Sequence, residues 1–128
     1  MKIVVMIARL LLGAIFVFFG MNVYLQFLHA PPMPPGAMAD FSTVLMVTHY
    51  MHVVAIFQVV PGLLLLFNRY VPLALTLLAP VIFNILVTHT LMQPQGLPPG
   101  IVAMLLWLLV YWHNRSAFAG IFQRKVEA

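Results

Sequence analysis

Amide, hydroxyl and imidazole side chains lie within otherwise apolar stretches of the sequence, and several pairs of them are three or four residues apart. They are Asn22 and Gln26 in one stretch, His49, His52 and Gln58 in a second, and Asn84, Thr88 and His89 in a third. Residues three or four apart share one face of a helix, and polar groups in lipid require hydrogen-bond partners. Two interpretations follow: hydrogen bonds between helices, or a layer that binds a small polar group, such as a quinone head group, in an apolar crevice.

The ligand-binding interpretation rests on six amide and imidazole side chains, five of which lie toward one end of the three stretches, with Gln58 near the middle of the second. The candidates are Asn22, His49, His52, Gln58, Asn84 and His89. Two histidines on facing helices at matched depth have the arrangement for axial haem ligation, but there is no second matched pair, so haem is not expected. A metal ion is not expected either, because no carboxylate lies within the apolar stretches to support it.

The composition places these stretches in a membrane. Of the 128 residues, 64% are hydrophobic and only 6% are charged, whereas a soluble domain is about 25% charged. This excludes a soluble enzyme, and the Lys and Arg residues form no basic stripe of the kind that binds nucleic acid. The chain has no cysteine, which excludes disulfides, thiolate metal sites and iron–sulfur clusters. No catalytic constellation is present, so the chain is expected to be at most a subunit of an oxidoreductase complex.

The hydrophobic pattern predicts an all-α, four-helix transmembrane bundle as a single domain over residues 1–128. The predicted spans cover residues 3–28, 41–67, 71–92 and 100–122, each with the roughly 20 residues that a bilayer requires. Proline-rich segments at 29–40 and 93–99 and a polar turn at 68–70 separate them, because proline ends helices. The first stretch exceeds the about 7–15 apolar residues of a signal peptide, which favours an uncleaved span.

The basic residues predict the orientation of the spans. They are Lys2, Arg9, Arg69, Arg115, Arg124 and Lys125. With four spans, all of them fall on one side of the membrane, and the positive-inside rule then places both termini in the cytoplasm. The expected location is a bacterial-type cytoplasmic (inner) membrane, crossed several times.

Five further residues within the spans, of three types, are expected to shape the packing of the helices. Arg9 lies about two turns inside the first span and either snorkels to the inner head groups or pairs inside the bundle. Gly13 and Gly20 favour close helix approach. Pro61 and Pro80 are expected to kink the second and third spans.

Taken together, these features make the sequence resemble the DoxX-like membrane proteins over nearly the whole chain. The resemblance rests on the segments 9–22, 58–66, 68–75 and 78–89, including Arg9, Gly13, Gly20, Pro72, Pro80, Asn84 and His89, and on the proline-rich loop. It implies a compact four-helix bundle with both ends cytoplasmic. The family takes its name from a small subunit of a quinone-reducing thiosulfate oxidoreductase, and its members often carry Glu where this chain has Gln58.

Three functions are compatible with these features. The first is a non-catalytic DoxX-like subunit or accessory protein that contacts a partner membrane protein or a second copy of itself, in a complex that the resemblance suggests is redox-linked. The second is a quinone-binding or electron-transfer subunit, in which His89 and Asn84 contact a carbonyl oxygen. The third is a small-solute transporter, which the absence of carboxylates within the spans and of an evident inverted repeat disfavours.

Overall fold

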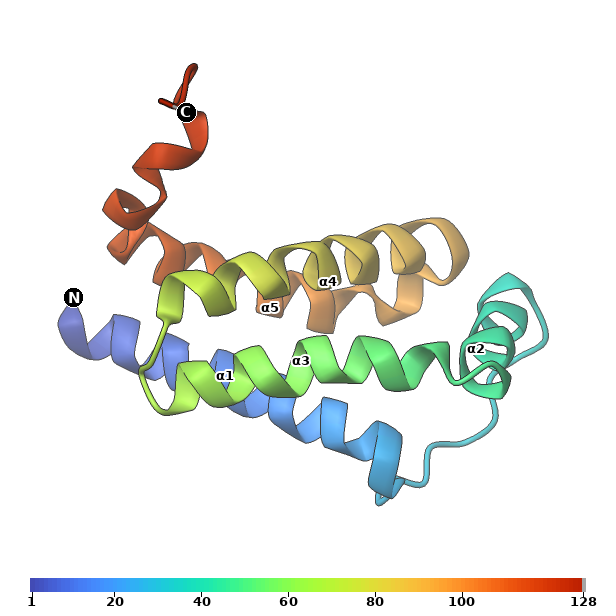
Figure 1. The fold of residues 1–128 in the computed structure, drawn as a ribbon. Coiled ribbons are helices and arrows are strands. Elements are labelled where there is room, and N and C mark those ends of the chain that lie inside the picture. The colour runs from blue at the N-terminus through green and yellow to red at the C-terminus, as the bar shows by residue number, and fades with distance from the viewer. Residues whose placement is uncertain (128) are drawn as a thin grey trace.

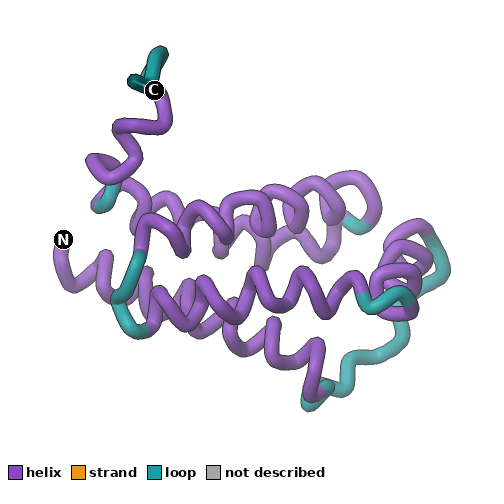
Figure 2. The backbone as a smooth tube through the Cα atoms, in the orientation of Figure 1, coloured by secondary structure: helices purple, strands orange, loops and turns teal. Residues whose placement is uncertain are grey.

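The computed structural model describes residues 1–127, which form helices, turns and loops without a strand among them. The prediction of an all-α chain is confirmed for these residues. The helices are α1 (Lys2–Leu25), α2 (Ala37–Val47), α3 (Tyr50–Leu66), α4 (Val71–Met92) and α5 (Leu97–His113), with two 3₁₀ helices, η1 (Pro94–Gly96) and η2 (Arg115–Phe122). Figure 2 shows that loops occupy only the connections and the C-terminal end.

The four long helices run along a common direction, and each contacts two neighbours (Figure 1). Helix α1 packs against α3 and α5, and α4 packs against the same two helices. Both chain termini lie at one end of this arrangement, where η2 turns away from α5. The short helix α2 lies across the opposite end, next to the start of α3.

The predicted span over residues 41–67 is not one continuous helix. It is divided into α2 and α3, which are bent by 85° relative to each other. The break lies at Thr48 and His49: His49 has a left-handed backbone with φ of 60°, and the Thr48 hydroxyl donates to the Val44 carbonyl at 2.6 Å. A left-handed residue cannot continue a right-handed helix, so α2 ends there and α3 begins in a new direction.

The other helix bounds differ from the prediction at their ends, and the largest difference is in the predicted fourth span. Helix α1 stops at Leu25 because Gln26 is left-handed, whereas the prediction extends it to residue 28. Helix α4 covers the same residues as the predicted third span. Helix α5 begins at Leu97, with Pro98 and Pro99 in its first turn, where a missing N–H costs little. It ends at His113, and η2 covers the remainder of the predicted fourth span.

Three helical segments are long and apolar enough to cross a membrane, namely α1, α4 and Pro94–His113. A fourth is counted if the bent pair α2 and α3 is one span. Large apolar side chains are exposed on the outer faces of these helices, Ile3, Phe19, Phe83 and Leu105 among them. In water such a surface is highly unfavourable. The structure is therefore compatible with a multi-pass membrane protein whose outer surface contacts lipid.

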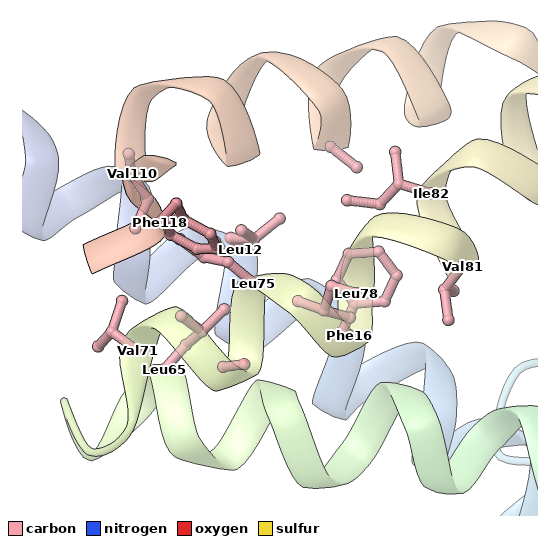
Figure 3. Close-up of a cluster of buried hydrophobic side chains, with 13 residues drawn as sticks. Leu12, Phe16, Leu65, Val71, Leu75, Leu78, Val81, Ile82, Val110 and Phe118 are labelled. Atoms are coloured by element: carbon pink, nitrogen blue, oxygen red, sulfur yellow. The ribbon is translucent and has the colours of Figure 1, made fainter. Parts of the chain in front are cut away.

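A buried core fills the end of the molecule that carries the termini (Figure 3). Leu12 of α1, Leu65 of α3, Leu75 of α4 and Val110 of α5 are fully buried in it. The Trp107 indole N–H donates to the Leu75 carbonyl at 2.9 Å and links α5 to α4. On α4 the buried residues of this core extend from Val71 to Ile82. The part of α4 after Ile82 contributes no fully buried side chain to the core.

Glycines bring the backbones of α1 and α3 together. A Cβ atom on Gly13 would lie 2.8 Å from the Gly62 carbonyl oxygen, and one on Gly62 would lie 2.9 Å from the Gly13 carbonyl oxygen. A Cβ on Gly20 would lie 2.6 Å from a methyl group of Val59. Small residues permit such close approach between membrane helices, so the packing role expected of Gly13 and Gly20 agrees with the structure.

Arg9 pairs inside the molecule rather than only reaching toward its surface. Its half-buried guanidinium donates to the backbone carbonyls of Leu65 and Leu66, at the C-terminal end of α3. The last carbonyls of a helix lack partners within the helix and carry partial negative charge. Arg9 therefore satisfies them and joins α1 to the end of α3.

Replacing Gly13 by Ala is expected to destabilise the protein by about 1–3 kcal/mol, because the added methyl group meets backbone that cannot move without separating α1 from α3. Thermal unfolding in detergent micelles measures this change. The matched control is Gly120→Ala, whose Cβ meets no atom within 4 Å. Equal melting temperatures for the two variants would contradict the packing argument.

Arg9→Met keeps most of the apolar stem but leaves two backbone carbonyls without their cationic donor. We expect a loss of about 1.5–3 kcal/mol, the range for hydrogen bonds to charged groups. Unfolding by increasing mole fractions of sodium dodecyl sulfate measures it. Lys2→Met, at an exposed position of the same helix, is the control and leaves the transition unchanged. If the unfolding transition of Arg9→Met is not shifted, the guanidinium does not stabilise the contact between α1 and α3.

Candidate functional site

A cavity of about 1070 Å³ lies at the end of the molecule opposite the termini. Its walls come from the end of α1 and the loop after it, from α2, from the first half of α3 and from the second half of α4. This volume is at the upper end of the range typical of small-molecule sites. The close packing of the core therefore gives way, along the same helices, to a space of ligand size.

One face of α4 forms the longest wall of the cavity. Its lining residues are Leu77, Pro80, Val81, Asn84, Ile85, Thr88 and His89. These positions recur at the three- and four-residue spacing of one helix face. From Leu77 to His89 the wall is about 18 Å long, at 1.5 Å per residue. The cavity is thus elongated, and its apolar groups are joined by polar ones toward the end of α4.

Helix α2 covers the cavity because the break before α3 turns it across this end. Met38, Phe41, Ser42 and Leu45 line the cavity and share one face of α2. Asp40, on another face, is exposed. In one straight helix over residues 41–67, as predicted, the residues of α2 would have extended α3 along its own axis and would not cover the cavity. The 85° bend therefore creates the enclosure.

Four of the six predicted ligand-binding residues line this cavity together. They are Asn22, Gln58, Asn84 and His89. Gln26 and Thr88, which the one-turn spacing paired with Asn22 and Asn84, also line it. The structure thus brings together amide and imidazole groups from α1, α3 and α4, which are separated by long distances in the sequence.

His49 and His52 do not line the cavity, in contrast to the prediction. They form a separate aromatic cluster with Tyr24: the His49 and His52 ring centroids are 5.0 Å apart, and those of Tyr24 and His52 are 5.2 Å apart. The Tyr24 hydroxyl donates to the His52 carbonyl. The bend at His49 changes the direction of the helix here, and of the three histidines only His89 belongs to the cavity lining in the described part of the chain.

Gln58 is the buried polar side chain of the core helices. Only 5% of its surface is exposed, and its Oε1 atom makes no hydrogen bond within residues 1–127. It lies at the inner end of the cavity, and Gly20 of α1 packs against its Cβ. A buried polar group without a partner costs about 1–3 kcal/mol. The chain accordingly keeps an unsatisfied amide at the wall of a ligand-sized space.

Asn22 has a structural role as well as a place in the cavity wall. Its Oδ1 accepts a hydrogen bond from the Leu28 backbone N–H at 2.9 Å. The backbone N–H of Gln26 donates to the Asn22 carbonyl and closes the end of α1. With its oxygen engaged in this way, the Asn22 side chain has only its NH₂ group left for other partners.

His89 is held from two sides. Its Nδ1 lies 2.8 Å from the Ile85 carbonyl oxygen, one turn earlier on α4. The other edge of the ring lies against Gly96, where a Cβ atom would be 2.7 Å from Nε2 and 2.3 Å from Cδ2. The ring is therefore fixed in orientation, with the Nε2 edge away from α4's backbone.

Sequence reasoning missed Thr48 and Gln93, which also line the cavity, and Gly96, which contacts His89. Gln93 follows His89 by four residues, so the same one-turn spacing would have identified it had the helix been continued into the predicted loop. Thr48 gave no comparable signal, since its position depends on the break at His49.

No Asp, Glu, Lys or Arg belongs to the cavity lining in the described part of the chain. Groups of three or more His, Cys, Asp or Glu side chains able to hold a metal ion are likewise absent from residues 1–127. Charged ligands buried without a counter-charge are strongly disfavoured. The walls therefore suit a neutral molecule with an apolar body and hydrogen-bonding groups.

The chain was also compared with known proteins. No protein-family model matches it, and neither a curated protein nor a solved structure does so.

Proposed function

We propose that this chain is a subunit of the bacterial-type cytoplasmic membrane that binds a neutral, lipophilic ring molecule of the quinone class. The observation that carries the proposal is Gln58, a buried amide without a partner at the inner end of a ligand-sized cavity. Its unpaired atom is Oε1, an acceptor, and a hydroxyl of the reduced form of such a ring donates to it. The protein has no catalytic constellation of its own, and we assign it a non-catalytic role beside a redox-linked membrane complex.

The chemistry of the cavity walls supports this ligand class. The lining combines Met, Leu, Val and Phe side chains with a few amides, hydroxyls and one imidazole, and it carries no charge. Quinones have the matching character, because an apolar ring and tail carry two oxygen atoms that hydrogen-bond. Asn84 and His89 both belong to this wall and are five residues apart, which is about 7.5 Å along α4.

The topology that we propose is a four-helix transmembrane bundle with both termini in the cytoplasm. It is supported by the contacts of α1 and α4 with α3 and α5, by the termini lying at one end, and by the six basic residues on that side of the sequence. The cavity then lies in the outer half of the membrane. The resemblance to the DoxX-like proteins agrees with this arrangement, but the proposal rests on the cavity.

Because the chain has no cysteine, single thiols report the topology without background. Thr43→Cys, on an exposed face of α2, and Ser116→Cys, exposed on η2, lie at opposite ends of the molecule. In intact spheroplasts a membrane-impermeant maleimide is expected to label Thr43→Cys, and to label Ser116→Cys only after lysis. Labelling of Ser116→Cys before lysis overturns the proposed orientation.

Gln58→Leu is expected to separate ligand binding from stability. It removes an unsatisfied acceptor, so the melting temperature is unchanged or higher, while the affinity for the reduced, hydroxyl-bearing form falls about tenfold, the value of one hydrogen bond. Binding of duroquinone and of its reduced form to the protein in nanodiscs, measured by calorimetry with empty nanodiscs subtracted, tests this.

The control for this experiment is Thr76→Val, because Thr76 is exposed on α4 and lies outside the cavity lining. Its binding is expected to equal that of the unmodified chain. Loss of stability with unchanged affinity in Gln58→Leu shows that Gln58 only holds helices together. Failure of the unmodified chain to bind either form removes the quinone proposal.

A further inference from the structure

We infer that the outer end of the cavity selects the hydroxyl form of its ring ligand, a hydroquinone or related phenol, over the carbonyl form, because His89, Thr88 and Thr48 present hydrogen-bond acceptors to it. The inference rests on the proposed function, since it concerns the same cavity. It adds which redox form of the ligand the site holds.

The first step concerns the proton of His89. The Nδ1 atom lies 2.8 Å from the Ile85 carbonyl oxygen, and a carbonyl oxygen only accepts hydrogen bonds. The proton of the neutral ring is therefore on Nδ1, and Nε2 carries a lone pair. Within residues 1–127 this Nε2 has no hydrogen-bond partner. His89 consequently offers an acceptor and no donor to a ligand.

The second step extends the same reasoning to two hydroxyls of the cavity wall. Thr88 donates its proton to the Asn84 carbonyl at 2.8 Å, with the Ile85 carbonyl at 3.2 Å. Thr48 donates to the Val44 carbonyl at 2.6 Å. Both protons are committed to the carbonyl oxygens of their own helices, so each hydroxyl oxygen can only accept. The Thr48 oxygen already accepts from the Tyr50 backbone N–H at 3.4 Å, which leaves it one further lone pair.

These three groups belong to one end of the cavity. Thr88 and His89 are adjacent near the end of α4, and Thr48 lies at the break before α3. The Asn84 and Gln93 amides of the same wall carry both donors and an acceptor, so they can bind either form. A quinone brings only acceptor oxygens, which form no hydrogen bond with the acceptors of His89, Thr88 and Thr48. A hydroquinone brings two O–H donors. The arrangement expected from the sequence, with His89 contacting a carbonyl oxygen, is therefore replaced by His89 accepting from a hydroxyl.

Gly96 keeps His89 in this orientation. A Cβ at residue 96 would lie 2.3 Å from Cδ2 and 2.7 Å from Nε2 of the ring, while the backbone at Gly96 has negative φ and accepts Ala without strain. Gly96→Ala therefore acts on the His89 ring. Gly96 is a positioning residue for the acceptor rather than a ligand contact.

The test measures the ratio of the dissociation constants of duroquinone and durohydroquinone for the full chain in nanodiscs, under argon. We expect the hydroquinone to bind about tenfold more tightly, the equivalent of one neutral hydrogen bond. His89→Phe keeps a ring but removes the acceptor, and it lowers the ratio toward one. Gly96→Ala lowers it as well, while the protein keeps its helical content by circular dichroism.

The matched controls are His113→Phe, at an exposed position outside the cavity, and Thr90→Val, two residues from Thr88 on another face of α4. Both are expected to keep the ratio. A ratio of one, or tighter binding of duroquinone by the unmodified chain, overturns the inference and leaves the proposed function standing. Binding of neither compound overturns both. An unchanged ratio in His89→Phe and Gly96→Ala, with helical content retained, overturns the role of His89.

Discussion

The structure depends on which atoms its few polar side chains form hydrogen bonds with. Every side-chain hydrogen bond found among residues 1–127 has a backbone atom as its other partner. An apolar environment supplies no water, so the protein itself must satisfy each polar group. Some of these bonds, such as those of Arg9 and Trp107, join helices. Others stay within one helix and determine which lone pairs remain for a ligand.

The same four helices produce a tightly packed half and a hollow half. In the packed half, the backbones of α1 and α3 touch at Gly13 and Gly62, and the buried core fills the space toward α4 and α5. In the hollow half, α2 lies across the helix ends instead of extending α3, and larger gaps are left between side chains. The buried core and the proposed binding cavity thus lie at different ends, so a change at one end is expected to leave the other largely intact.

Helix limits and part of the candidate site could be predicted from the sequence, because they follow from local patterns. The polar turn at 68–70 and Pro72 locate the start of α4, and one-turn spacing identifies Asn84, Thr88 and His89 as one face. The break at His49 was not predicted, because residues 41–60 contain neither proline nor glycine, the usual signals for the end of a helix. Histidine adopts left-handed backbone more often than most residues, but His49 alone does not distinguish a break from a continuous span. The prediction that His49 and His52 line the site differs from the structure because of the positive φ angle of His49, which turns the helix there. The proton position on His89 requires the distance to Ile85, which no sequence pattern contains.

The bend between α2 and α3 also has a consequence for the surrounding lipid. With 17 residues, α3 is about 26 Å long, whereas α1 with 24 residues is about 36 Å long. The hydrocarbon layer of a typical bilayer is about 30 Å thick. Acyl chains beside α3 must therefore shorten by several ångströms, while those beside α1 need not. Such one-sided thinning costs a fraction of a kcal/mol per ångström, and it draws the protein toward thinner regions of the membrane or toward neighbours that cover the short side.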